Sequence, residues 1–384
     1  MKRSKFNSVG IWIFVASLIL GACSEKPQTF SELLVSLKDQ PGPQAELRLR
    51  DFAQRHLFPF VEDSTVYFLF EDTTRVPVFL AGDFTDWRPD SIELKPIANT
   101  SFYYTKATFP SNARLEYKFV SGKNWMLDPF NPYKEEDGYG FNSVLMMPEY
   151  VFPKETLLNL KYRVSEMDTL EFKSRLLHNR RRVTVYRHPS AGKQAPLFIF
   201  NDGSDYLRFA RVRIILDNLI GSGYLQPINA LFVDPVQRNK EYWLNERYLK
   251  MVFTELVPFA EQRYALKPKS IAFGGASLGG TTALFALKNY GQKIDFVFCQ
   301  SAALGIEKSR LLRVLQTVPH IKAKIYLSYG SFEGKQMRRN YQKLKSILIN
   351  KKTKFTIQCF PQGHNWGNWR DHLKNALMFR GQPE

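Results

Sequence analysis

A serine lies between closely spaced glycines in the segment Gly275-Ala-Ser277-Leu-Gly279. The pattern Gly-x-Ser-x-Gly is typical of a nucleophile elbow, a sharp turn between a strand and a helix that exposes the serine hydroxyl. A strand-like apolar run at 270–273 ends at this motif, and residues 278–290 read as a helix that opens with small residues and closes at Gly291. This context, more than the short motif alone, predicts that Ser277 is a catalytic nucleophile.

A serine nucleophile needs a general base, and in chains with this elbow the order is serine, then acid, then histidine. His364 lies in the segment Phe360–Trp369, a loop after the last strand-like run and before a final helical stretch. This is where the base is expected. The chain has six histidines, and five of them lie outside this loop: His56, His178, His188, His320 and His372. We therefore predict His364 as the base.

The acid should follow the strand-like run 325–329, where the next loop offers one carboxylate, Glu333. Glu333 would hold His364 in the correct tautomer and stabilise the imidazolium that forms during catalysis. Asp234 and Asp371 are alternatives, and a dyad that needs no acid is a third.

The negative charge that develops during ester cleavage needs N–H donors. In chains with a nucleophile elbow, one donor is the backbone N–H of the residue after the nucleophile, here Leu278. The other donor comes from the loop after an early strand. The segment Asn201-Asp-Gly-Ser204 follows the apolar run 197–200. We predict Gly203 as the second donor, with Ser204 as the alternative.

From residue 150 to 384 the pattern that positions these residues alternates between strand-like and helical runs. The strand-like runs are 181–186, 196–200, 228–233, 270–273, 296–299, 325–329 and 355–358, and helical stretches such as 248–263 and 340–349 lie between most of them. This order predicts an α/β domain with a mostly parallel, doubly wound sheet that helices cover on both faces.

Residues 61–149 have a different pattern, with short β-rich runs at 65–70, 76–80, 102–105 and 115–120 between turn-rich segments. This predicts a small antiparallel β-sandwich. Residues 23–60 read as a polar tether followed by two short helices around Pro41-Gly42-Pro43.

The first residues look like an export signal. Lys2, Arg3 and Lys5 precede an apolar core at 9–20 that is too short to span a membrane comfortably. The core ends in Leu20-Gly21-Ala22-Cys23, which resembles a bacterial lipobox. We therefore predict a signal peptide at 1–22, a lipid on Cys23 and a lipid-anchored protein of the cell envelope, with the membrane leaflet left open. An ordinary cleaved signal is the alternative.

The 384 residues contain 54 Lys and Arg against 36 Asp and Glu, which gives a net charge of +18. This charge suggests an anionic partner. No nucleic acid is expected, because an exported protein does not meet it, and the basic run 173–182 reads as a solvated strand face. Three cysteines exclude a disulfide-rich scaffold and a four-cysteine zinc site, and Cys299 and Cys359 are expected to be free thiols rather than a disulfide. The sequence gives no indication of oligomeric state.

Several motifs in the β-rich segment resemble early-set immunoglobulin-like domains, which occur beside glycogen-active enzymes and before the catalytic domain of enterochelin-esterase-like proteins. The motifs are the segments 80–87, 117–120, 125–132 and 140–144. Trp87 and Trp125 lie within them. Core packing is the commoner role for such tryptophans, and stacking on a sugar or an aromatic ligand is the alternative.

The C-terminal motifs resemble the putative esterase family, which includes enterochelin esterases, esterase-D-like proteins and feruloyl or acetyl-xylan esterases. They are the segments 200–203, 238–242, 255–264, 275–280 and 363–370, and the resemblance extends over about residues 61–380. It implies an α/β-hydrolase fold and ester cleavage without metal or cofactor. It also implies that Arg238 faces the substrate. The aromatic loop from Trp366 to Trp369 is a second candidate contact, because an indole can stack on a substrate ring. An ion pair with Glu241 is the simpler interpretation of Arg238.

These observations favour an exported, lipid-anchored serine esterase. Its substrate would be a small-molecule or glycan ester, either a catecholate siderophore, which is anionic, or an ester-decorated polysaccharide. One alternative is a glycan-binding lipoprotein with an inert hydrolase fold, and another is an acyltransferase on the same fold.

Overall fold

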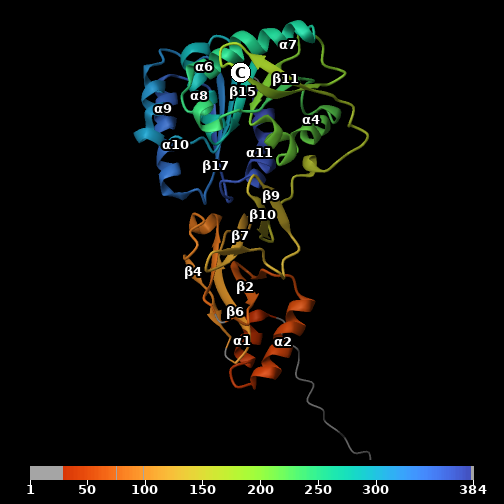
Figure 1. Cartoon of the computed structure of the whole chain (residues 1–384), viewed down its shortest axis with the longest axis vertical. Coiled ribbons are helices and arrows are strands. Elements are labelled where there is room, and N and C mark those ends of the chain that lie inside the picture. The colour runs from red at the N-terminus through yellow and green to blue at the C-terminus, as the bar shows by residue number, and fades with distance from the viewer. Residues whose placement is uncertain (1–28, 75, 98, 382–384) are drawn as a thin grey trace, which may run out of the picture.

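The computed structural model describes residues 29–381, except residues 75 and 98. The predicted signal peptide and Cys23 therefore lie outside the described residues. The chain folds into a broad α/β head and a narrower β-rich stalk, with two helices at the far end of the stalk (Figure 1). Within the described residues, no helix combines the length and the apolar composition that a membrane crossing requires.

The head is built on one sheet of eight strands. Its order is β11 (Glu166–Ser174), β12 (Asn179–Arg187), β14 (Asn229–Val233), β13 (Leu197–Asn201), β15 (Ile271–Ala276), β16 (Phe296–Gln300), β17 (Lys324–Gly330) and β18 (Phe355–Phe360). Strands β13 to β18 run parallel to one another. Strands β12 and β11 extend the sheet at one edge through antiparallel pairing. The run that forms β11 escaped the sequence analysis because its side chains are mostly polar and only two of its nine residues are buried.

Helices cover both faces of this sheet. One face carries α3 (Gly203–Arg208), α4 (Val212–Gly221) and α11 (Trp366–Gly381). The other carries α5 (Arg238–Tyr242), α6 (Glu246–Met251), the π-helical turn η3 (Val252–Leu256), α7 (Val257–Arg263), α8 (Leu278–Tyr290), α9 (Ile306–Thr317) and α10 (Gly334–Asn350). Strand β13 shows how the chain supplies both layers, because Leu197 and Ile199 enter one core while Phe198 and Phe200 enter the other.

The stalk contains two antiparallel sheets. The first has the order β1 (Phe60–Glu62), β2 (Thr65–Glu71), β6 (Phe102–Thr108), β5 (Lys95–Pro96). The second has the order β4 (Ile92–Glu93), β3 (Val78–Gly82), β7 (Arg114–Ser121), β10 (Gly140–Met146), β9 (Lys134–Asp137), and β8 (Asn124–Met126) pairs with β7. A 3-10 turn, η1 (Asp83–Thr85), follows β3.

Strand β2 is buried on both of its faces. Val66 and Phe68 point into the core between the two sheets, whereas Tyr67 and Leu69 pack against helices α1 (Phe30–Ser36) and α2 (Gly42–Arg55). The two helices therefore cover the outer face of the first sheet. The immunoglobulin-like assignment of this domain stays a prediction.

Buried charges join the stalk to the head. Arg114 of β7 and Arg370 of α11 both bind Glu135, with N–O distances of 2.9 and 2.6 Å. Asp371 completes the group, and the two arginine side chains are each only 2% exposed. Because each arginine has a carboxylate partner, the interface avoids an unpaired buried charge.

The two described cysteines are free, as predicted. Cys299 is buried in β16 and Cys359 lies on β18, with strand β17 between them. Two strand spacings of about 4.8 Å each place their Cα atoms beyond the reach of a disulfide.

Candidate active site

Ser277 occupies a strained turn between β15 and α8. Its backbone has φ +53° and ψ −120°, a conformation that costs a residue with a side chain about 1–3 kcal/mol. A Cβ atom built on Gly275 would lie 2.9 Å from the carbonyl carbon of Gly279, which is too close for any side chain. The two glycines therefore allow the strand and the helix to approach each other at the serine.

The structure brings Ser277, His364 and Glu333 together. His364 Nε2 lies 3.0 Å from the hydroxyl oxygen of Ser277, and His364 Nδ1 lies 2.8 Å from a carboxylate oxygen of Glu333. The histidine side chain is 41% exposed, whereas that of Glu333 is 1% exposed. The arrangement can pass the serine proton to the histidine and stabilise the resulting imidazolium. Asp234 and Asp371, the alternative acids, bind Ser204 and Tyr150 instead.

The second carboxylate oxygen of Glu333 has its own donors, which the sequence did not reveal. It accepts the hydroxyl of Ser301 at 2.5 Å and the N–H of Gly330 at 2.6 Å. Ser301 in turn accepts the indole N–H of Trp369 at 2.9 Å. These bonds fix which oxygen of Glu333 faces His364. In the sequence, only the position of Ser301 could have pointed to it. Ser301 follows strand β16, which lies beside β15, the strand that precedes Ser277.

The turn after β13 leaves one N–H for a substrate. The N–H of Asp202 donates to the hydroxyl of Tyr242, and the N–H of Ser204 donates to Asp234. Among the described residues no acceptor is bonded to the N–H of Gly203. A Cβ on Gly203 would lie 2.2 Å from the carbonyl carbon of Phe232, so this position requires glycine. Ser204 is thus a poorer candidate donor than Gly203.

Leu278 is the first residue of α8. Its N–H therefore has no intrahelical acceptor and lies directly after the nucleophile, the position from which an oxyanion donor acts in this fold.

Arg238 binds the carboxylate of Asp202 through two nitrogens, at 2.7 and 2.8 Å. The alternative pairing with Glu241 is wrong, because Glu241 accepts two bonds from Arg181. Burial raises the pKa of Asp202, and the bidentate Arg238 opposes that shift. Since Asp202 precedes Gly203, the pair holds the turn that carries the candidate oxyanion donor.

Replacement of Arg238 by alanine is expected to lower both stability and aryl-ester turnover, since it leaves the buried carboxylate of Asp202 uncompensated. Breaking a fully buried pair costs about 3–5 kcal/mol, and the 38% exposure of Arg238 reduces this to about 1–3 kcal/mol. Thermal unfolding and kcat measure the two effects. The control is Arg180→Ala, whose pair with Glu171 is about 60% exposed on both sides and should change neither quantity. Unchanged kcat in Arg238→Ala would contradict the role in the turn.

Trp366 lies in the core and not at the opening of the site. It is 8% exposed and packs against Tyr206, Phe209 and Trp369, with ring centroids 4.8 to 5.8 Å apart. Because these neighbours occupy its faces and edges, we do not retain it as a substrate contact.

Trp125 is 43% exposed, so the expectation of core packing is wrong for this residue. Its ring centroid lies 6.3 Å from that of Trp87. The two rings form a pair on the second sheet of the stalk, where Trp125 pairs in register with Val120 of β7.

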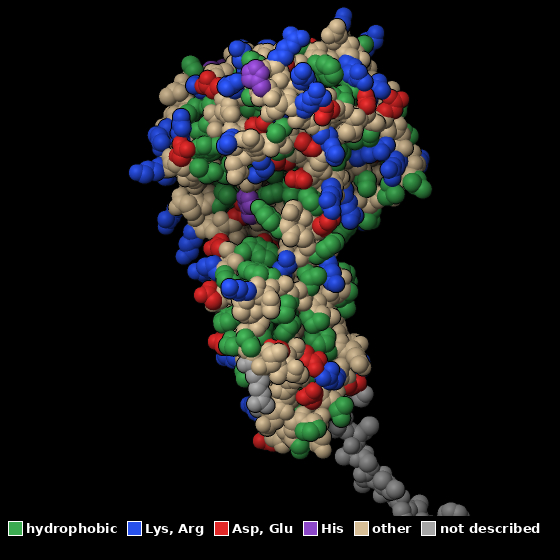
Figure 2. Space-filling view, in the orientation of Figure 1, with side chains coloured by type: hydrophobic (Ala, Val, Ile, Leu, Met, Phe, Trp, Pro, Cys, Tyr) green, Lys and Arg blue, Asp and Glu red, His purple; other side chains and the backbone are tan. Residues whose placement is uncertain are grey.

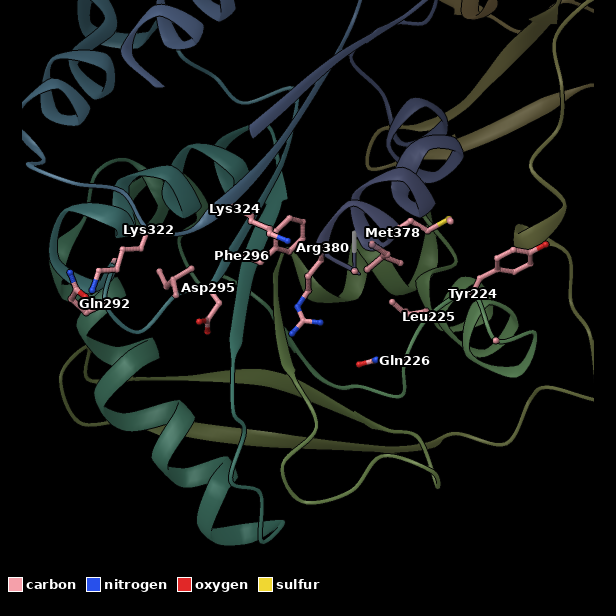
Figure 3. Close-up of a pocket in the computed structure, with 15 residues that line it drawn as sticks. Tyr224, Leu225, Gln226, Gln292, Asp295, Phe296, Lys322, Lys324, Met378 and Arg380 are labelled. Carbon is pink, nitrogen blue, oxygen red and sulfur yellow. The ribbon is translucent and has the colours of Figure 1, made fainter. Parts of the chain in front are cut away.

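A cavity of about 730 Å³ (Figure 3) lies away from the candidate catalytic residues Ser277, His364 and Glu333. Asp295, Phe296 and Lys324 line it at the amino-terminal ends of β16 and β17, and Arg380 lines it at the end of α11. Ser277 follows the carboxyl-terminal end of β15, so the cavity lies at the opposite edge of the sheet from the candidate active site. On the face of the head that Figure 2 shows, Lys and Arg side chains are spread widely rather than gathered in one patch.

Two of the similar solved structures cover most of this chain, including parts of both the head and the stalk. The enterobactin esterase from Shigella flexneri, solved in the presence of enterobactin, is 21% identical, has a TM-score of 0.72 and covers 84% of this chain and 95% of its own. The ferric enterobactin esterase from Salmonella typhimurium is 19% identical, has a TM-score of 0.71 and gives the same coverage. At these identities the likeness shows the fold. It confirms the predicted α/β-hydrolase preceded by a β-rich domain.

A curated relative, an uncharacterized protein called YbbA from Bacillus subtilis, is 25% identical over 203 residues, which are 47% of this chain and 78% of the relative. The model of the family described as Putative esterase matches residues 174–379, more than half of the chain and nearly all of the head. This segment contains the nucleophile elbow and the loops of Glu333 and His364. The chain therefore belongs to the Putative esterase family and is a carboxylic ester hydrolase with the fold of the enterochelin esterases.

Proposed function

We propose that this chain is an exported, lipid-anchored serine esterase in which Ser277, His364 and Glu333 form the catalytic triad. The observation that carries the triad is the continuous hydrogen-bonded path from the Ser277 hydroxyl through His364 to the buried Glu333. A binding protein with an inert hydrolase fold has no need of this path, so the geometry favours an active enzyme. Export and lipid anchoring are supported by the basic and apolar segments before Cys23 and by the lipobox-like sequence that ends there.

In the proposed mechanism, His364 Nε2 removes the proton of Ser277 as its oxygen attacks the ester carbonyl. The N–H groups of Gly203 and Leu278 stabilise the oxyanion. Collapse of the tetrahedral intermediate breaks the bond to the alcohol oxygen, which takes the proton from His364, and leaves an acyl group on Ser277. Water, activated by the same histidine, then releases the acid. Transfer of the acyl group to a sugar hydroxyl instead of water would make the protein an acyltransferase.

Two measurements test the proposal. Hydrolysis of an aryl acetate should release one equivalent of acid for each equivalent of alcohol, because an acyltransferase would give an ester product instead. A fluorophosphonate probe should label the wild-type protein once, and mass spectrometry should locate the label on Ser277. Labelling elsewhere, or no labelling of an active protein, would reject the assignment.

For the substrate we propose a catecholate siderophore ester. The two enterobactin esterases match this chain over both domains, and the excess of Lys and Arg over Asp and Glu, which persists without the proposed signal peptide, would attract a ferric tris-catecholate, which is anionic. The Trp87–Trp125 pair, in which Trp125 is exposed, favours a second candidate, an ester on a polysaccharide, because sugar rings stack on such surfaces.

Hydrolysis of a ferric siderophore and of feruloylated or acetylated glycans at matched concentrations separates the two candidates. If the siderophore is the substrate, its turnover should exceed that of the glycans and should fall as salt rises, because salt screens the attraction. Higher activity on the glycans would reject the siderophore and leave the esterase.

Cys23→Ser is expected to move the protein from the membrane fraction to the soluble fraction of the cells, because the proposed attachment is a covalent lipid. Fractionation and mass spectrometry of the mature N-terminus check this result, with an active-site variant such as Ser277→Ala as the control that should stay in the membrane fraction. An unmodified N-terminus beyond residue 23 would contradict lipidation.

A further inference from the structure

The β-rich domain contacts the loop of His364 through one buried carboxylate. Asp83, in the turn η1, is 4% exposed. Its Oδ2 atom accepts the side-chain N–H of Asn365 and the backbone N–H of Glu116, both at 2.8 Å, and its Oδ1 atom accepts the indole N–H of Trp87 at 3.2 Å. Asn365 is the residue directly after His364. A side chain of the first domain is therefore bonded to the neighbour of the candidate base.

Asn365 passes this contact to the backbone of the loop. Its side-chain oxygen accepts the N–H of Asn368 at 2.9 Å, and the side chain of Asn368 donates to the carbonyl of Gly363 at 2.8 Å. These bonds begin and end on either side of His364. A Cβ on Gly363 would lie 2.1 Å from the carboxyl carbon of Asp83, so the carboxylate also rests directly against this backbone.

The loop that contains Glu333, the candidate acid, also contacts the β-rich domain. Phe332, the residue before Glu333, packs against the core between the two sheets of the stalk, and its ring lies 6.1 Å from that of Phe109. Its N–H donates to the carbonyl of Gln362 in the loop of His364. The two catalytic loops are thus bonded to each other, and both are held by the β-rich domain.

We propose that the β-rich domain is part of the esterase machinery and that Asp83 is a positioning residue, which fixes through Asn365 the turn that carries His364. The inference rests on the proposed role of His364 as the base. Asp83 does not touch the reacting atoms. It acts by keeping the histidine at hydrogen-bond distance from Ser277, and a displacement of about 1 Å at a catalytic group can cost on the order of 10²-fold in rate.

Asp83→Ala should therefore lower kcat for a small aryl ester by about 10- to 100-fold and leave KM nearly unchanged, because Asp83 acts on the position of His364 and is bonded to Asn365, Glu116 and Trp87. Asp83→Asn should keep most of the activity, since one oxygen placed as Oδ2 still accepts from Asn365 and Glu116. Assays at pH 8 suit this comparison. Burial and the charge of Glu116 raise the pKa of Asp83 to about 7, so the wild-type group is mainly ionised there.

Asp128→Ala is the matched control. Asp128 is an equally buried carboxylate of the same domain, 1% exposed, and it bonds the Tyr117 hydroxyl and the N–H of Phe130, both within the stalk. Its loss should lower the unfolding temperature as Asp83→Ala does, while kcat stays within about twofold of wild type. Equal losses of kcat in the two variants would overturn the proposal, because they would reflect general destabilisation. Unchanged kcat in Asp83→Ala would also overturn it.

Asn365→Asp decides the question if Asp83→Ala does not fold. This variant keeps an acceptor for the N–H of Asn368 but places a second carboxylate against Asp83 Oδ2, so it should lower kcat. Unchanged kcat in Asn365→Asp at pH 8 would overturn the proposal. His364→Ala reports separately on the proposed function. If that variant stays active, the triad assignment fails, whatever the Asp83 variants show.

Discussion

Replacement of Ser277 by alanine is expected to lower kcat for an aryl ester on the order of 10⁴-fold or more and to leave thermal unfolding nearly unchanged. In the proposed mechanism the hydroxyl oxygen forms the acyl-enzyme, and the N–H groups of Gly203 and Leu278 alone could not replace it. Alanine keeps the Cβ atom and the strained backbone of this position, which is why the unfolding temperature should stay close to that of wild type.

His364→Ala should be about as severe, because the serine and its base act as one unit, and the double variant should be little worse than either single variant. Steady-state kinetics on protein purified from a host without background esterases give these values. Turnover near the wild-type rate in either single variant would show that another nucleophile or base is at work.

Glu333→Gln is expected to lower kcat on the order of 10²- to 10⁴-fold, although the side chain has nearly the same shape. The N–H of Gly330 and the indole-bonded hydroxyl of Ser301 both point at Oε1, so the amide oxygen takes that position. The amide N–H₂ then faces His364 Nδ1, which must become an acceptor. The proton moves to Nε2, and the histidine can no longer take the proton of Ser277.

The pH dependence of kcat/KM and the loss in kcat check this expectation together. Ser301→Ala serves as the milder companion, because Glu333 keeps its bonds to Gly330 and His364 and the tautomer stays correct. A fully active Glu333→Gln variant would contradict the assignment of the acid and would point to a Ser277–His364 dyad, since Asp234 and Asp371 are bound elsewhere.

The sequence predicted the head and the residues placed at its sheet edge. The carboxyl ends of parallel strands meet at one edge, so residues that follow β15, β17 and β18 must lie close together. This topology brings together Ser277, Glu333 and His364, which are far apart in sequence, and each follows a strand that its apolar run had marked. Gly203 follows β13 at the same edge for the same reason.

The contacts between domains could not be predicted in this way. Asp83 and Asn365 are separated by 282 positions, and no periodicity or motif couples them. The ion-pair partner of Arg238 could not be predicted from the sequence either. Glu241 lies close to Arg238 along the chain, whereas Asp202, its partner in the structure, is distant in sequence and is brought to it by the fold. Trp366 was chosen for the aromatic character of its segment, yet Trp366 and Trp369 are both buried, because helix α11 begins at Trp366 and packs both indoles into the core.

The left-handed backbone of Ser277 sets stability against activity at a single position. Glycine adopts φ near +53° without steric cost, so Ser277→Gly should unfold at a higher temperature than both wild type and Ser277→Ala, and it should be inactive. Selection for thermal stability alone would therefore favour loss of the nucleophile. A serine in such a conformation is expected where its hydroxyl is needed for turnover, and an engineered version of this protein should be stabilised at positions away from the elbow.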